Sequence, residues 1–458
     1  MKWEHLLSKA RFKIGKNGVE PSITQASVEG SKVKRSDFMI DYDRLVFSTS
    51  FRRLGRKTQV HPFSEKAHIH NRLTHSMEVA SVGRSMGNQL GVMLESELPL
   101  GVEPDDIGSV VQVACLAHDL GNPPFGHAGE EAIQEWFAVE GIPYLKDLSR
   151  EEKCDVMTYE GNAHTMRLVA NLEMYRHNGG MRLTAASLGT LMKYPWQSLN
   201  APFGKFNLYQ TELPLLERVC ETLGLKRLNN KHFARHPLSY LMEAADDICY
   251  ALLDLEDAID LGVLEVEDVQ EVLNPIVSET MRQEDLSPLQ YCRRLRGKAI
   301  GNAISDVVQT FVKYKKEILQ GEFPAKDLLA LSSSSLSEAI HNAKKIARDK
   351  IFINTFKLNT EIASFPCLGS ILRLLIPATY RFIQGTDKKL VSDRYALCLL
   401  KEEPIQKTDS LYIAYMKVLD FVGALTDDEA ARLAREVSGI GIIPVSYTHL
   451  RAHETVLD

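Results

Sequence analysis

Residues 110–127 of the chain read VVQVACLAHDLGNPPFGH. An apolar run over 110–117 leads into His118 and Asp119, and the glycine- and proline-rich turn that follows cannot continue a helix. An imidazole nitrogen and a carboxylate oxygen held side by side at a helix end can both bind one divalent cation. An ordinary capping or surface pair has the same composition, because Asp and His are both common at helix ends. The choice between the two readings depends on the rest of the chain.

The overall composition is that of a globular protein. The chain has 458 residues, of which 44% are hydrophobic and 25% are charged, without the bias that marks disordered, fibrous or membrane proteins. Its seven cysteines are scattered and form no C-x-x-C pair, which predicts reduced thiols. The first residues, MKWEH, are charged where a signal peptide needs an apolar core, and no run of about 18 uncharged apolar residues follows. We therefore expect a cytoplasmic protein that does not contact a membrane.

Helical periodicity dominates from about residue 37 to residue 436, and alternating strand patterns are scarce. One clear example is an apolar stripe whose members step by four and three residues: Leu241, Ala245, Ile248, Leu252 and Leu255. Such a stripe is typical of a helix with one buried face. The sequence therefore predicts an all-α protein.

We predict four parts along the chain. Acidic and turn residues between Asn274 and Pro288 interrupt the apolar pattern and indicate a boundary. The last 14 residues resemble a translated adapter read-through and are not expected to be native to the fold. The predicted parts are an N-terminal segment (1–36), a helical core (37–274), a helical C-terminal region (275–444) and the suspected non-native tail (445–458).

Two further segments carry groups that a metal site beside the His-Asp pair would need. His75 opens an amphipathic helix, and Arg72 stands one turn before it. Asp246, Tyr250 and Asp254 recur every four residues, so they share one helix face. An acidic face alone is more often solvated surface, and a single histidine is often a core or capping residue. Two histidines with two aspartates, however, form an N2O2 ligand set that suits Mn, Fe, Ni, Co or Zn and can hold Mg less tightly.

The order His75, His118-Asp119, Asp246 resembles that of the HD phosphohydrolase superfamily. The surrounding segments look like the bacterial deoxyguanosine triphosphate triphosphohydrolases in particular, and they run in the order of that family. The matching strings are FRRL (51–54), KTQV (57–60), NRLTHS (71–76), HDLGNPPFGH (118–127), EGNA (160–163), MKYP (192–195) and EAADDICY (243–250). Beyond residue 275 the resemblance is weaker: LDFVGALTD (419–427) is similar to a late family helix, but Glu429 stands where an aromatic residue is expected.

The resemblance implies a fold with an HD-domain helical core and a helical C-terminal extension. It also implies hydrolysis of a deoxynucleoside triphosphate at the α-phosphorus, with dGTP giving deoxyguanosine and tripolyphosphate. His127 would be the general acid, and Glu130 would orient it or the attacking water. The implied cofactor is Mn²⁺ or Mg²⁺, with Fe, Co, Ni or Zn as alternatives. Its implied ligands are His75, His118, Asp119 and Asp246.

The resemblance also suggests substrate contacts. Arg72, Lys193 and Lys205 are the candidates for binding phosphates. Tyr250 and Asp254 would contact the sugar 3'-hydroxyl, and Gln59 with Val60 would close against the 2'-carbon and exclude ribose. The full expected set is Gln59, Val60, Arg72, Asn122, Lys193, Tyr194, Lys205, Asp247, Tyr250 and Asp254.

Two other functions fit part of the pattern. Another HD enzyme, such as a nucleotide monophosphatase or a cyclic or alarmone phosphodiesterase, would use the same metal ligands. A nucleotide-sensing or single-strand nucleic-acid-binding protein could keep the scaffold and use the basic cluster at Arg52–Lys57. The net charge of -6 gives no global signature of nucleic-acid binding. Some family members bind nucleic acid, so single-stranded nucleic acid is a possible partner. The family also suggests a homo-oligomer, a hexamer, and a nucleotide activator.

Overall fold

The structure of the chain is a computed structural model. The structure describes residues 1–15, 18–22, 35–59, 70–173, 180–229, 231–260, 262–277, 286–351, 355–385 and 390–440. Val60 and the predicted tail at 445–458 lie outside these residues. Helices account for 67% of the structure and strands for 4%, which confirms the prediction of an all-α protein.

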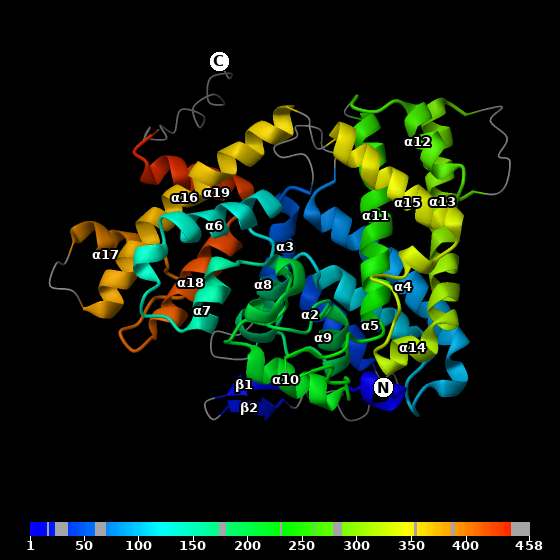
Figure 1. Cartoon of the computed structure of the whole chain (residues 1–458), viewed down its shortest axis with the longest axis horizontal. Helices are drawn as coiled ribbons and strands as arrows, with labels where there is room; N and C mark the ends of the chain where they lie inside the picture. Colours follow the sequence, from blue (N-terminus) through cyan, green and yellow to red (C-terminus); the bar gives the residue numbers. More distant parts are fainter. Residues whose placement is uncertain are drawn as a thin grey trace, which may run out of the picture.

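The helices differ widely in length, and the longest are α4, α11, α13 and α16 (Figure 1). The α-helices are α1 (Trp3–Leu6), α2 (Asp37–Val46), α3 (Thr49–Arg53), α4 (Arg72–Met93), α5 (Pro104–Ala117), α6 (His127–Val139), α7 (Arg150–Met157), α8 (Gly161–Arg167), α9 (Ala185–Leu191), α10 (Leu213–Thr222), α11 (Ser239–Asp260), α12 (Val266–Leu273), α13 (Pro288–Lys313), α14 (Lys315–Gln320), α15 (Ser334–Ile346), α16 (Thr355–Gln384), α17 (Val391–Leu397), α18 (Leu411–Ala424) and α19 (Asp427–Val437).

Short segments connect these helices. The 3-10 turns are η1 (Leu54–Arg56), η2 (Glu95–Glu97), η3 (Ile142–Tyr144), η5 (Ser198–Asn200), η6 (Pro202–Gly204) and η7 (Leu329–Leu331), and two π-helical turns are η4 (Leu168–Leu172) and η8 (Ala347–Ile351). The strands β1 (Phe12–Gly15) and β2 (Gly18–Pro21) form an antiparallel hairpin in which Phe12 pairs with Pro21. In Figure 1 the hairpin lies at the edge of the molecule, next to α10.

Helix α4 packs closely against α5 because small residues line their contact. A Cβ atom at Gly87 would lie 2.6 Å from the Cα of Gly108, and one at Gly91 would lie 2.2 Å from the carbonyl oxygen of Pro104. Real side chains do not tolerate such distances, so glycine is required for this approach. Helix α11 packs against both α4 and α5. The three helices that carry the predicted metal ligands are therefore neighbours.

Two hydrophobic clusters stabilise the molecule. The first joins α4, α5 and α11 with α9, α13 and α15, and the second joins α6 and α7 with α16 and α18. Figure 1 shows these two groups of helices on opposite sides of the molecule. Each cluster thus combines helices from before and after residue 274. The four-part division by residue number remains a prediction.

Among the described residues, α16 is the one helix long and apolar enough to cross a membrane, judged by length and composition alone. Over Lys357–Gln384, however, 56% of its most apolar window is buried inside the protein. Leu368, Ile371 and Leu375 of this helix are fully buried in the second cluster. The core helix of a water-soluble protein passes the same test, so length and composition are weak evidence for a membrane span.

Candidate metal and nucleotide site

His75 is positioned by the start of α4. The side chain of Asn71 accepts a hydrogen bond from the backbone N–H of Thr74, and the Thr74 hydroxyl accepts one from the N–H of Asn71. This capping box fixes where the helix begins. It places the buried imidazole of His75 toward α11, with Nε2 3.2 Å from Oδ1 of Asp246.

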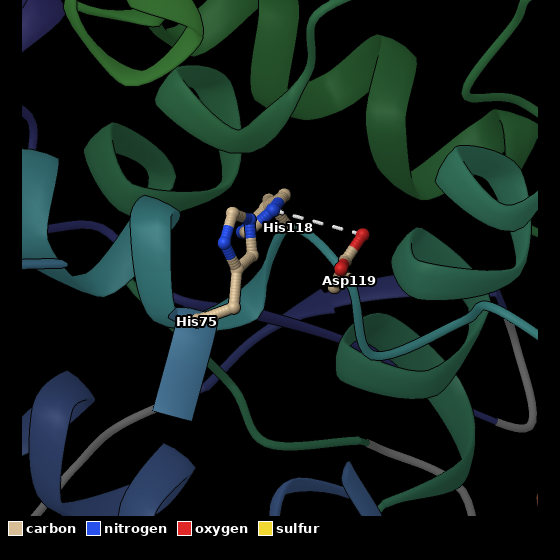
Figure 2. Close-up of side chains that lie close together, drawn as sticks. All are labelled: His75, His118 and Asp119. Carbon is tan, nitrogen blue, oxygen red and sulfur yellow. Dashed lines mark ion pairs between the residues drawn. The ribbon is translucent and has the colours of Figure 1, made fainter. Parts of the chain in front are cut away.

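His118 lies at the C-terminal end of α5, and its ring is oriented by the backbone. Its Nδ1 lies 2.6 Å from the carbonyl oxygen of Cys115, so Nδ1 donates there and Nε2 remains for another partner. Nε2 is 3.6 Å from Oδ1 of Asp119 and 3.5 Å from Oδ1 of Asp246. Figure 2 shows His75, His118 and Asp119 turned toward one another, and one ligand atom from each lies within 4.8 Å of the others.

Two neighbours hold the Asp119 carboxylate. Nη1 of Arg72 lies 2.5 Å from Oδ2, and Nδ2 of Asn122 lies 2.5 Å from Oδ1. Although burial favours the neutral acid, the charges of Arg72 and His118 lower the pKa of Asp119 to about 2. Each carboxylate oxygen has two lone pairs, so these hydrogen bonds leave a lone pair on each oxygen for a cation.

The cluster carries strong negative charge around its imidazoles. Burial disfavours protonation of His118, but the carboxylates of Asp119 and Asp246 outweigh it and raise the pKa to about 9. Burial likewise opposes ionisation of Asp246, yet the neighbouring histidines hold its pKa well below the usual range. Carboxylates that attract a proton so strongly also attract a divalent cation. The donor set of two imidazole nitrogens and two carboxylates therefore fits a transition metal or Mg²⁺.

A second pair of groups stands at the start of α6. Nδ1 of His127 lies 2.9 Å from Oε2 of Glu130. Glu130 is buried, and its Oε1 accepts a hydrogen bond of 2.7 Å from the backbone N–H of Gly161. The His127 side chain is 77% exposed, so the pair joins a fixed carboxylate to an accessible imidazole.

The charges around this pair favour a protonated His127. The hydrogen bond with Glu130 raises the pKa of His127. Burial opposes ionisation of Glu130, but the hydrogen bond from His127 and the charge of Lys205 lower its pKa. Nζ of Lys205 lies 2.8 Å from Oε2 of Glu160 and 3.5 Å from Oε2 of Glu130. Lys205 is thus a cation beside the pair.

Three of the four proposed metal ligands (His75, Asp119 and Asp246) and His127 face one cavity of about 350 Å³, which suits a small molecule such as a nucleotide. His118 and Glu130 are not part of its wall. The predicted residues in its wall are Gln59, Arg72, His75, Asp119, Asn122, His127, Asp246 and Tyr250. Oε1 of Gln59 is buried and accepts no hydrogen bond from the described residues. A buried acceptor without a partner is uncommon, and the Gln59 side chain would have to turn for this oxygen to meet a ligand.

The wall also contains residues that the sequence analysis did not single out. Thr58 and Phe125 come from loops beside predicted residues, and Lys357, Thr360 and Glu361 come from the first turns of α16. The i, i+4 spacing of Lys357 and Glu361 was visible in the sequence, and their side chains lie 3.2 Å apart. That spacing is equally typical of a solvated helix face, so it did not mark a site.

Several predicted substrate contacts lie elsewhere or have protein partners. Nζ of Lys193 is 3.2 Å from Oε1 of Glu243, and Oδ1 of Asp247 is 2.7 Å from Nζ of Lys344. Four predicted substrate residues are not part of the cavity wall: Lys193, Tyr194, Lys205 and Asp247. Asp254 lies on α11, but its side chain is outside the described structure, as is Val60.

The helical fold and the His-Asp pair at the end of α5 are those of an HD-domain protein. The sequence matches the HD domain family over residues 72–220. The chain is 42% identical to a deoxyguanosinetriphosphate triphosphohydrolase-like protein of Pseudomonas aeruginosa, with 96% of this chain and 99% of that protein covered. A protein of the same name from Synechocystis is 35% identical over 96% of this chain and 100% of its own. The deoxyguanosinetriphosphate triphosphohydrolase of Yersinia pestis is 29% identical over 78% of this chain and 79% of its own. The chain therefore belongs to the deoxyguanosinetriphosphate triphosphohydrolase-like family of HD-domain proteins, as the resemblance predicted.

Proposed function

We propose that the protein is a metal-dependent deoxynucleoside triphosphate triphosphohydrolase that converts dGTP and water into deoxyguanosine and tripolyphosphate. The observation that carries this proposal is the shared cavity. Its wall contains three of the four proposed metal ligands, His75, Asp119 and Asp246, together with His127, whose Nδ1 is hydrogen-bonded to Glu130 outside the wall. Hydrolysis of a phosphate ester needs both an activated water and a proton donor for the leaving oxygen.

A divalent cation would be held by His75, His118, Asp119 and Asp246. When bound it would supply a hydroxide at neutral pH and polarise a phosphoryl oxygen. Mn²⁺ and Mg²⁺ are the proposed ions, and the two imidazole ligands also admit Fe, Co, Ni or Zn. Nη1 of Arg72 holds Asp119, which keeps one carboxylate of the set ionised and oriented.

His127 would give its proton to the 5'-oxygen of the leaving deoxynucleoside. Glu130 supports this role because it accepts a hydrogen bond from Nδ1 and raises the pKa of the imidazole. The acid form is then available near neutral pH. Lys205 adds positive charge beside Glu130 and is a candidate to bind the triphosphate.

Two further residues of the cavity wall would contact the sugar. Tyr250 lies in the cavity wall, four residues beyond Asp246 on α11, where it could reach the 3'-hydroxyl. Gln59 is also in the wall, and its buried Oε1 accepts no hydrogen bond from the described residues. We propose that Gln59 and Val60 exclude a 2'-hydroxyl and that Asp254 assists Tyr250.

Other parts of the predicted biology also remain proposals. They are a cytoplasmic location, a homo-oligomeric state, a nucleotide activator and an interaction with single-stranded nucleic acid. Three predicted substrate residues lie outside the cavity wall: Lys193, Tyr194 and Asp247. Lys193 is paired with Glu243, and Asp247 is paired with Lys344. They would contact the substrate only if it displaces these partners or extends beyond the cavity.

The test is product analysis by ion-exchange chromatography. The protein is loaded with Mn²⁺ or Mg²⁺ and incubated with each of the four deoxynucleoside triphosphates, alone and with a second nucleotide. Deoxyguanosine and tripolyphosphate in equal amounts from dGTP are expected, and Asp246→Ala should form neither. Orthophosphate or pyrophosphate would instead indicate another HD-type nucleotide phosphohydrolase or phosphodiesterase. Binding of nucleotide without any turnover would indicate a nucleotide sensor.

A further inference from the structure

One carboxylate at the corner between α18 and α19 contacts two residues of the cavity wall. Oδ1 of Asp427 accepts a hydrogen bond of 2.9 Å from the backbone N–H of Phe125, and Oδ2 accepts one of 2.9 Å from the N–H of Thr58. Asp427 is only 3% exposed. One side chain therefore ties together two loops that are far apart in the sequence.

Both loops lead directly to residues of the proposed active site. Phe125 has a φ angle of 65° and Gly126 one of 60°, and α6 begins with His127 immediately after them. A phenylalanine in this left-handed region is strained and persists only where its surroundings hold it. Thr58 directly precedes Gln59, which is in the cavity wall. Asp427 thus binds the backbone next to the proposed acid and next to the proposed sugar-binding residue.

The same corner is docked by a buried lysine. Nζ of Lys57 donates hydrogen bonds of 2.6 Å to the carbonyl oxygens of Asn122 and Gly423. The absence of a side chain at Gly423 lets α18 pack closely against Tyr159, because a Cβ atom there would lie 2.6 Å from the hydroxyl oxygen of Tyr159. Lys57 therefore joins the helix corner to the loop that follows the His-Asp pair.

Helices α18 and α19 are themselves fixed. Both carboxylate oxygens of Asp420 on α18 bind the guanidinium of buried Arg167, each at 2.7 Å. At the start of α19, Thr426 and Glu429 form a capping box, with Oε2 of Glu429 2.9 Å from the N–H of Thr426. Glu429 stands where the family resemblance led us to expect an aromatic residue, and in this chain it caps the helix that carries Asp427. The ion pair on α18 and the capping box on α19 thus fix the position of Asp427, which lies between them in the chain.

We propose that Asp427 is a positioning residue for the reaction. It holds the strained turn before His127 and the loop before Gln59 in a fixed arrangement. The proposed acid, His127, and the proposed sugar-binding residue, Gln59, can then contact the same substrate molecule. The catalytic part of this inference rests on the proposed function. Its structural part, the coupling of two loops through one carboxylate, does not.

Asp427→Asn is the informative variant, because the shapes of the two side chains match. A carboxylate accepts from both N–H groups, whereas an amide accepts from one and turns an NH₂ donor toward the other. Asp427→Ala removes both acceptors. Glu436→Gln is the matched control, since Glu436 lies on the same helix, α19, and is exposed.

The first measurement is hydrogen–deuterium exchange in the full chain. Both Asp427 variants should increase exchange in peptides covering residues 56–59 and 121–127, by at least tenfold in Asp427→Ala at one or both amides. Glu436→Gln should leave both peptides as in the wild type. This readout needs no turnover. Unchanged exchange in both peptides of a folded Asp427→Ala protein would overturn the inference.

The second measurement is turnover of dGTP and GTP by the metal-loaded proteins. For Asp427→Asn we expect kcat to fall at least tenfold with metal content unchanged, since small displacements of a catalytic group have effects of this size or larger. The preference for dGTP over GTP should also fall several-fold, which a general loss of folded protein would not cause. Wild-type kcat and wild-type sugar preference in Asp427→Ala would overturn the positioning role. If exchange changes as expected but the wild type hydrolyses no nucleotide, the coupling stands and the proposed function fails.

Discussion

Nδ1 of His127 and Oε2 of Glu130 are 2.9 Å apart, and the histidine is exposed while the glutamate is buried. Glu130 cannot move easily, because its other oxygen accepts a hydrogen bond from the backbone N–H of Gly161. The glutamate therefore fixes the orientation of the imidazole and keeps Nδ1 occupied. The proton that a substrate could receive is then the one on Nε2.

Replacement of His127 tests whether this proton is used. His127→Ala should lower kcat by about 10²- to 10⁴-fold, the usual contribution of a general acid. Bound metal should stay at the wild-type level, because His127 is not among the residues that form the ligand cluster. Turnover and metal content are measured on the same sample. Full activity in His127→Ala would show that another group protonates the leaving oxygen.

Glu130→Gln tests the electrostatic part of the pair. Glu130 raises the pKa of His127, so removing its charge should lower that pKa. If the protonated imidazole is the reactive form, activity declines as the pH rises through this pKa, and in Glu130→Gln the decline should begin at a lower pH. The pH profile of kcat is the measurement, with the exposed neighbour Glu131→Gln as the control. A decline at the wild-type pH would separate Glu130 from the ionisation of His127.

Asp246→Ala tests the ligand set. Asp246 lies 3.2 Å from Nε2 of His75 and 3.5 Å from Nε2 of His118, so it is the carboxylate that connects both imidazoles. We expect the purified variant to retain almost no metal and to lose activity in proportion. Metal analysis after dialysis is the measurement, with Glu271→Ala at an exposed position of α12 as the control. Full metal occupancy in Asp246→Ala would remove Asp246 from the ligand set.

Local sequence patterns were sufficient to predict the all-α fold, and together with the family resemblance they led to the proposed ligand set. Helical periodicity and helix-ending residues are short-range signals, and the four proposed ligands come from segments that match the HD family. The role of Asp427 could not be predicted in this way, because its partners are backbone N–H groups 302 and 369 positions away. A backbone amide has no residue type, so it leaves no signal in the sequence.

The same limit explains the predicted contacts that have other partners. Lys193 and Asp247 were expected to face the substrate, but Glu243 and Lys344 lie beside them in the fold. A charged residue in a segment that resembles the family indicates that the segment lies near the site. Which residue its side chain contacts depends on tertiary packing. For this reason the residues at the start of α16 were also missed.

Gly423→Ala should destabilise the docking of the α18–α19 corner. The added methyl group would lie 2.6 Å from the Tyr159 hydroxyl oxygen and 2.9 Å from Nε2 of His164. Overpacking of this kind lowers the free energy of unfolding by about 1–3 kcal/mol. Gly301→Ala, in the exposed middle of α13 with no atom near the added methyl group, should instead be neutral or stabilise by up to about 1 kcal/mol. Urea denaturation compares the two, and equal stability of both variants would contradict the close packing.

His70 links the start of α4 to α11 and should make stability depend on pH. Its Nδ1 lies 2.7 Å from Oδ1 of Asp257, and its Nε2 lies 3.0 Å from Oε1 of Glu78. Both carboxylates favour the imidazolium, and together they raise the pKa of His70 to about 10. In the unfolded chain the pKa is about 6.5.

The folded state therefore binds this proton more tightly than the unfolded state does. The resulting stabilisation is complete below about pH 6.5 and is lost as the pH rises from there toward 10. Because His70 is partly exposed, solvent screening reduces the effect to about 1–2 kcal/mol. We expect the difference in unfolding free energy between the wild type and His70→Gln to shrink by this amount between about pH 6 and pH 9.5. His341→Gln, an exposed histidine on α15, controls for histidine removal itself. A difference that stays constant with pH would show that His70 is not held as an imidazolium by Asp257 and Glu78.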